Sequence, residues 1–338
     1  MSKTTAFLAL AVLLAGLLAA NLFVGSVPIA APDVVDALTG RADGTAAFIV
    51  TETRLPQALT ALMAGAALAV AGLLMQTVFA NPLADPSILG LNAGAGLGVA
   101  VATLALGGSF AAGAGLSLSG FALTLVAAFA GAAGVLVLLM ACAARMRSRL
   151  LLLIVGLMIS YAVGALVSLL SFTADAAGLH SYVLWGLGSF GQATWGRLPL
   201  FALAVGVGLG VAALLVKPLN ALLLGESYAA NLGVRIRRTR CLLLGAAGLL
   251  AAAVTALCGP VAFVGLAVPH VARLLVRSAD HRVLLPATLL CGADVALACH
   301  LVCRLPSDGG LLPLNAVTPL VGVPVVFYVI LRQRHAAD

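Results

Sequence analysis

The chain has 338 residues, of which 63% are hydrophobic and only 9% are charged, and its formal net charge is +7. A soluble domain carries about 25% charged residues, so this composition excludes a soluble protein and indicates that lipid covers much of the surface. The basic residues stand in short clusters between apolar runs, which is typical of membrane topology and not of a face that binds nucleic acid.

Apolar runs long enough to cross a bilayer as helices recur along the whole chain. They cover about 5–24, 56–79, 88–107, 119–143, 150–172, 198–216, 241–258, 283–303 and 313–331. A shorter run, about 260–275, contains Pro260 and Pro269 and completes a set of ten. We therefore predict an all-α integral membrane protein of about ten transmembrane helices, formed by a single domain over residues 1–338.

The distribution of Lys and Arg predicts the orientation of these helices. With ten spans, both termini lie on the same side of the membrane. The opposite side then holds only Arg41, Arg54, Arg197 and Arg304, and every other Lys and Arg falls on the side of the termini. Because cytoplasmic loops carry the excess of basic residues, we expect both termini to be cytoplasmic.

A polar segment, about 217–240, interrupts the apolar pattern between the sixth and seventh long runs. Residues 226–232 (ESYAANL) have the composition of a short helix, with Glu226 in the first turn, where the helix dipole favours a negative charge. Gly233 is placed to end that helix as a C-cap glycine. The segment is thus either a surface helix that binds a partner on the cytoplasmic side or an ordinary polar loop.

Four stretches carry more specific information than the apolar runs. They are RLPQALTALMAGAALAVAGLLMQTVFANPLADPSILGLNAGAGLG (54–98), LNALLLGESYAANLGV (219–234), GPVAFVGLAVPHVARLL (259–275) and NAVTPLVGVPVVFYVIL (315–331). In this order they resemble the FecCD/BtuC-type permeases of bacterial ABC importers, over nearly the whole chain.

The resemblance implies a BtuC-like type II importer permease in the bacterial inner membrane. It implies a homodimer of ten-span subunits that moves an iron–siderophore complex, heme or cobalamin. A cytoplasmic ABC ATPase dimer would drive transport, and a periplasmic substrate-binding protein would deliver the cargo. ATP and magnesium would bind to the ATPase and not to this chain.

The same resemblance assigns roles to individual residues. The polar segment corresponds to the family's coupling loop, and the residues that would contact the ATPase are Glu226, Ser227, Ala230, Asn231, Leu232 and Gly233. The cytoplasmic gate would comprise Asn81, Pro82, Leu83, Arg147 and Ser148, although Arg147 stands where relatives often have a small polar residue. Arg54 and Arg304 match arginines that meet the binding protein, or they extend to lipid headgroups. Many relatives read RLPR where this chain has Gln57.

The chain itself shows no nucleotide-hydrolysing motif. A phosphate-binding GxxxxGK[ST] loop needs a Gly-Lys pair, whereas Lys3 and Lys217 are the only lysines and neither follows a glycine. We therefore expect a transport subunit that is not an enzyme and has no cofactor or metal of its own. One alternative stays open, because Asp294 is an acid inside a predicted span, and such acids are usually functional or paired. That alternative is a proton-coupled secondary transporter.

Overall fold

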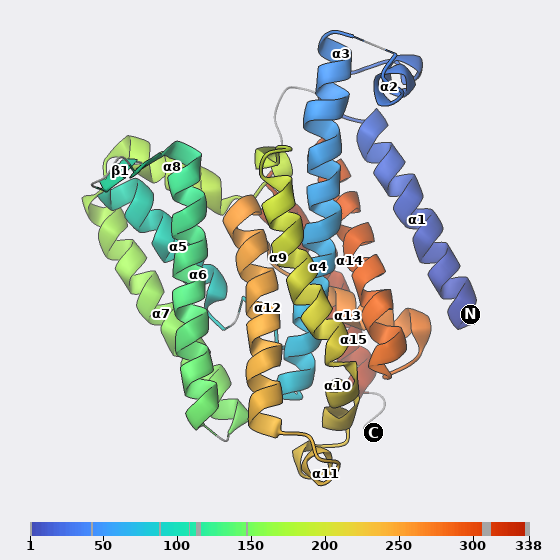
Figure 1. Cartoon of the computed structure of the whole chain (residues 1–338), viewed down its shortest axis with the longest axis vertical. Helices are drawn as coiled ribbons and strands as arrows, with labels where there is room; N and C mark the ends of the chain where they lie inside the picture. The colour runs from blue at the N-terminus through green and yellow to red at the C-terminus, as the bar shows by residue number, and fades with distance from the viewer. Residues whose placement is uncertain are drawn as a thin grey trace. The chain divides into compact units, whose positions relative to one another are not determined.

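The computed structural model describes residues 2–41, 43–87, 89–107, 109–112, 116–146, 148–305 and 312–334. Helices make up most of this part of the chain (Figure 1). The first half contains α1 (Lys3–Phe23), α2 (Ala31–Leu38), α3 (Thr45–Phe48), the π-helix η1 (Ile49–Arg54), α4 (Leu55–Phe79), α5 (Leu91–Ala100), the π-helix η2 (Val101–Ala105), β1 (Ser109–Ala112), β2 (Leu116–Ser119), α6 (Gly120–Arg145) and α7 (Arg149–Thr173). The second half contains α8 (Ala176–Gly186), the 3-10 helix η3 (Phe190–Gln192), α9 (Leu198–Leu214), α10 (Val216–Leu223), α11 (Glu226–Asn231), α12 (Ile236–Cys258), α13 (Val264–Val276), α14 (His281–Cys303) and α15 (Leu314–Arg334).

Every predicted apolar run coincides with a helix, but the helices differ in length. Within the described residues, six are long and apolar enough to cross a membrane: Lys3–Phe23, Thr45–Phe79, Gly120–Arg145, Leu150–Thr173, Ile236–Cys258 and His281–Cys303. Helices α9 and α10 together form a seventh candidate that is bent by 54°. Three further apolar helices are shorter: Leu91–Ala105, Val264–Val276 and Leu314–Tyr328. The helical, multi-span character is thus confirmed, whereas the number of ten crossings stays a prediction.

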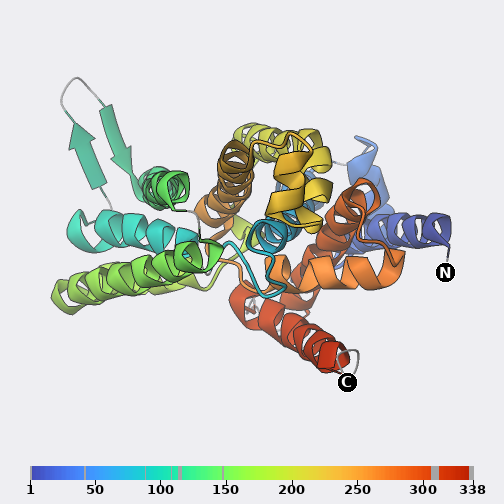
Figure 2. The ribbon, with the colours of Figure 1, turned by 90° about the horizontal axis from the view of Figure 1, so that it is seen from below.

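A short β-hairpin was not expected from the apolar pattern. Strands β1 and β2 pair antiparallel, with Ser109 opposite Ser119 and Ala112 opposite Leu116. Figure 2 shows the two strands as arrows beside the start of α6. The all-α prediction therefore needs this small correction: residues in the connection between two predicted spans are extended and pair with each other.

The chain divides into two compact units that alternate along the sequence. Unit 1 comprises residues 1–70, 189–206 and 261–338, and unit 2 comprises residues 71–188 and 207–260. Each unit has helix packing of its own. The single permease domain over 1–338 stays a prediction.

In unit 1, α14 packs against α1, α13 and α15, and it also meets the first part of α4. The contact with α4 is a direct approach of two backbones. A methyl group added to Gly65 would overlap the carbonyl oxygen of Gly292 and the side chain of Ala296, and a methyl group added to Gly292 would overlap the carbonyl oxygen of Gly65. Such small residues let helices pack closely in lipid, where van der Waals contact replaces the hydrophobic driving force.

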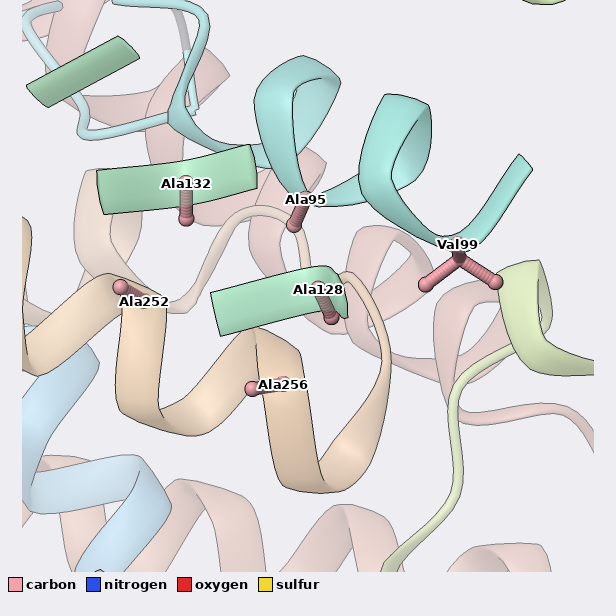
Figure 3. Packing of buried hydrophobic residues seen from close by; sticks show 6 residues of the cluster. All are labelled: Ala95, Val99, Ala128, Ala132, Ala252 and Ala256. Carbon is pink, nitrogen blue, oxygen red and sulfur yellow. The ribbon is translucent and has the colours of Figure 1, made fainter. Parts of the chain in front are cut away.

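In unit 2, α6 packs against both α5 and α12. The three helices meet through small side chains, which are shown in Figure 3: Ala95 and Val99 from α5, Ala128 and Ala132 from α6, and Ala252 and Ala256 from α12. Further along the pair formed by α6 and α12, Gly248 faces Leu136 and Gly245 faces Met140. These contacts show that α6 and α12 run antiparallel and stay in contact over most of their length.

Candidate functional site

The polar segment folds as two short helices, α10 and α11, followed by the start of α12. Gly225 has a φ of +100° and Gly233 a φ of +84°, so both adopt backbone conformations that favour glycine. At the end of α11 the Val234 N–H donates to the Ala229 carbonyl over 3.0 Å, and the Gly233 N–H donates to the Ala230 carbonyl over 2.9 Å. This pair of bonds is a Schellman C-cap. The predicted helix and its terminating glycine are therefore confirmed.

Helix α11 presents small side chains to the exterior. Ser227, Ala230, Asn231, Leu232 and Gly233 are exposed, and Glu226 is half-buried. The large apolar side chains that are exposed in the segment are those of Leu223, Leu224, Tyr228 and Leu232. Exposed apolar side chains and small polar residues at the end of α10 and along α11 suit close contact with a protein partner better than contact with water. The contact assignment itself stays a prediction.

A hollow of about 900 Å³ opens beside α11, within unit 2. Its lining comes from the end of α6, from α11 and from the start of α12: Ala143, Ala144, Arg145, Met146, Glu226, Ser227, Ala230, Ile236, Arg237 and Arg240. Arg240 is buried at its edge and pairs with the Glu226 carboxylate at 2.6 Å. The sequence showed an acid and several arginines here, but it did not show which arginine is buried and paired.

The loop between α4 and α5 contains three of the predicted gate residues, Asn81, Pro82 and Leu83. It is held by its own side chains, because the Asn81 Oδ1 accepts the Leu83 N–H over 2.9 Å and the Asp85 carboxylate accepts the Ser87 N–H over 3.0 Å. The Ser87 hydroxyl also donates to Asp85. Burial raises the pKa of the Asp85 carboxyl above its ordinary value, and the two bonds from Ser87 oppose that shift.

The other predicted gate residues follow α6. Ser148 caps α7, since its hydroxyl accepts the Leu151 N–H over 3.3 Å. Arg147 lies outside the described residues. The assignment of these positions to a gate remains a prediction.

Arg54 and Arg304 are buried within unit 1, with 3% and 8% of their surface exposed. The Arg54 guanidinium donates to the carbonyl oxygens of Leu22 at 2.7 Å, Phe23 at 3.0 Å and Val27 at 2.5 Å. The last carbonyls of a helix have no partner within that helix. Arg54 therefore closes the C-terminal end of α1.

Arg304 completes this arrangement at the same end of α1. It donates to the carbonyl oxygen of Asn21 at 3.2 Å and to the side-chain oxygen of Gln57. The glutamine that departs from the family pattern thus accepts a hydrogen bond from Arg304, which an arginine at that position could not do. Docking of the binding protein by Arg54 and Arg304 stays a prediction, and their contacts give both residues a structural role as well.

Asp294 is buried in α14, and among the described residues neither of its carboxylate oxygens has a hydrogen-bond partner. On the same helix, the His300 ring packs edge-on against Phe190 with centroids 5.3 Å apart. Cys299 and Cys303 are buried free thiols. Within the described part of the chain, no group of three or more His, Cys, Asp or Glu residues is arranged to hold a metal ion.

The long apolar helices define a multi-pass membrane protein, and between two of them lies a capped polar helix that is exposed beside a hollow. The FecCD transport family model matches residues 12–332. The chain therefore belongs to the FecCD transport family, and it is a permease subunit of an ABC importer and not a catalytic enzyme.

Curated relatives differ in the substrate that their names give. The chain is 38% identical over 287 residues to the vitamin B12 import system permease protein BtuC of Klebsiella pneumoniae, covering 85% of this chain and 83% of the relative. It is 33% identical over 281 residues to the hemin transport system permease protein HmuU of Yersinia pestis, covering 83% and 82%. It is 35% identical over 278 residues to the molybdate import system permease protein MolB of Haemophilus influenzae, covering 82% and 79%.

A solved structure agrees with the fold along nearly the whole chain. It is an inward-facing conformation of an ABC transporter described as of the metal-chelate type. The TM-score is 0.82 at 30% sequence identity, and the alignment covers 98% of this chain and 100% of that one. Neither the relatives nor the described residues support the proton-coupled secondary transporter.

Proposed function

We propose that this permease moves a metal chelate, either an iron–siderophore complex or heme, or else cobalamin. The observation that carries the proposal is the family match over residues 12–332, which includes the polar segment and the helices on both sides of it. Relatives named for hemin and for vitamin B12 support a large metal-containing cargo. The relative named for molybdate makes that oxyanion the competing candidate.

Transport is driven by a separate ATPase dimer that docks on α11. The exposed small residues of α11 permit a close approach, and the Schellman cap fixes the end of the helix. The permease acts as a homodimer and receives its cargo from a periplasmic binding protein. The solved ABC transporter of similar fold and the family membership support these partners.

The protein lies in the bacterial inner membrane with both termini in the cytoplasm. The distribution of Lys and Arg supports this orientation. Reporter tags inserted at Ser148, Glu226 and Asp280 are expected to read as cytoplasmic, and tags at Asp43, Ala176 and Gly309 as periplasmic. A periplasmic reading at Glu226 would remove the argument for an ATPase on α11.

The substrate is tested by uptake into proteoliposomes that contain the permease with an ABC ATPase and a periplasmic binding protein from the same organism. Ferric siderophore, hemin, cobalamin and molybdate are supplied in parallel, with ATP inside the vesicles. We expect ATP-dependent uptake of one of the first three. Uptake of molybdate alone would refute the proposed cargo and leave the permease class intact.

A further inference from the structure

We propose that Arg240 is a positioning residue that joins the docking helix α11 to the end of α6, so that movement of α11 is passed into the helices of unit 2. The inference rests on the proposed function, because it assumes that an ATPase moves α11. It concerns a residue that lies outside the predicted contact set, and it assigns that residue a role between the docking surface and the spans.

The contacts of Arg240 reach two separate segments. One terminal nitrogen, Nη2, donates to the Glu226 carboxylate in the first turn of α11 over 2.6 Å. The other, Nη1, donates to the carbonyl oxygen of Met146 over 3.2 Å. Met146 directly follows the last residue of α6, and Arg240 itself belongs to the second turn of α12. A single guanidinium group therefore links α11, α12 and the end of α6.

Burial makes this link stiff. Arg240 has 6% of its surface exposed, while the side chain of Glu226 keeps 31% at the edge of the hollow. A buried cation without its partner destabilises the folded protein strongly. Separation of the guanidinium from Glu226 is therefore unfavourable, and the contact is expected to persist when α11 moves. Only arginine offers a planar fork of donors that can satisfy two acceptors at once; the lysine ammonium is a compact point charge on a flexible stem.

Beyond Arg240, α12 packs closely against α6. Gly245 and Gly248 of α12 face Met140 and Leu136 of α6. Farther from Arg240, the same two helices meet through the small buried side chains shown in Figure 3. Close-packed interiors have low compressibility and transmit displacement. A shift of α11 that reaches Arg240 is therefore expected to move α6 and α12 as a body.

The link also lies next to the predicted docking residues. Ser227 and Ala230 line the same hollow as Glu226 and Arg240. A partner that fills the hollow would contact the exposed residues and press on the half-buried Glu226. Loss of Arg240 should consequently leave docking of the ATPase intact and impair the transfer of its movement to the spans.

The experiment compares Arg240→Met, Arg240→Lys and Glu226→Gln with Arg238→Met, which removes an exposed arginine from the start of the same helix. Each variant is purified with the ATPase and reconstituted with the binding protein. Three quantities are measured: the yield of the complex, the rate of ATP hydrolysis, and the amount of substrate transported per ATP hydrolysed. If Arg240 only stabilised the fold, the amount of substrate transported per ATP hydrolysed would not change in a normally assembled complex.

We expect Arg240→Met to assemble with the ATPase and to transport less substrate per ATP, by on the order of tenfold, which is within the usual range for coupling between two sites. Arg240→Lys should keep the charge, lose the contact with either Glu226 or Met146 and give an intermediate loss. Arg238→Met should match the wild type. Combining Glu226→Gln with Arg240→Met should add little to the loss from Arg240→Met alone, because both act through one contact.

An unchanged transport-to-ATP ratio in Arg240→Met would overturn the inference, and so would a fully additive double variant. If Arg240→Met does not reach the membrane, Arg240→Lys and Glu226→Gln decide: a wild-type ratio in either variant overturns the inference, and lowered ratios in both support it. Absence of ATP-driven transport by the wild type would instead refute the proposed function, which distinguishes the two failures.

Discussion

Replacing Arg54 by methionine tests whether this buried arginine stabilises the end of α1, docks the binding protein, or does both. In the structure its guanidinium donates three hydrogen bonds, to the carbonyl oxygens of Leu22, Phe23 and Val27. Methionine has similar length but no donor, so Arg54→Met leaves these carbonyls without their partner. If docking of the binding protein were the sole role of Arg54, the same change would lower affinity for that protein and leave the stability of the permease unchanged.

The size of the effect is set by these contacts. A hydrogen bond to a charged group contributes about 1.5–3 kcal/mol. The three bonds share one side chain and are not additive. We therefore expect Arg54→Met to lower the free energy of unfolding by about 3 kcal/mol. Arg54→Lys should recover part of this loss, because an ammonium group can still donate to one or two of the carbonyls.

Unfolding of the detergent-solubilised permease by SDS measures the effect, with Arg41→Met as the matched control. Arg41 is exposed in the same unit, so its loss should change the free energy of unfolding by no more than about 0.5 kcal/mol. Equal stability of the Arg54 and Arg41 variants would refute the structural role of Arg54. Reduced binding-protein affinity with unchanged stability would favour docking alone.

Three further changes test other parts of the structure. Gly65→Ala should lower the free energy of unfolding by about 1–2 kcal/mol, because a methyl group there forces α4 and α14 apart; Gly164→Ala, which meets nothing within 4 Å, should not destabilise the protein in the same SDS assay. Ala230→Trp and Gly233→Val should abolish co-purification with the ATPase at normal membrane levels. The first adds volume to the predicted contact surface, and the second strains a backbone with a φ of +84°. Unchanged association in both would show that α11 does not bind the ATPase. Since burial raises the pKa of Asp85 in the folded state, the wild type should lose stability relative to Asp85→Asn as pH rises above the ordinary value of 3.8, and thermal melting of both proteins at pH 4 and pH 7 checks this sign.

Local features of the structure could be predicted from the sequence. The apolar runs became helices because a helix satisfies its own backbone in lipid. Gly233 was identified as the end of α11 because a left-handed residue after a short helix is a local requirement. The motifs that resemble the FecCD family led to the correct class, which the family match confirms.

Contacts between distant segments could not be predicted in this way. Arg54 meets a carbonyl 32 residues earlier, and Arg304 meets one 283 residues earlier. Nothing in the local pattern distinguishes a buried arginine that caps a helix from an exposed arginine that docks a partner. The pairing of Arg240 with Glu226 depends in the same way on how three helices meet. The 54° bend between α9 and α10 falls where the predicted apolar run ends and the polar segment begins, and the composition there does not give its angle.

The most direct test of the account measures uptake by proteoliposomes under two driving forces, with ferric siderophore, hemin and cobalamin supplied in parallel. Two preparations are made, both with the binding protein: one contains the permease without the ATPase and the other contains both. Each preparation receives either ATP or an imposed proton gradient. The account predicts uptake only when ATPase and ATP are both present, and no uptake by the permease alone under either condition. Uptake of any candidate cargo by the permease alone, driven by the proton gradient, would contradict it.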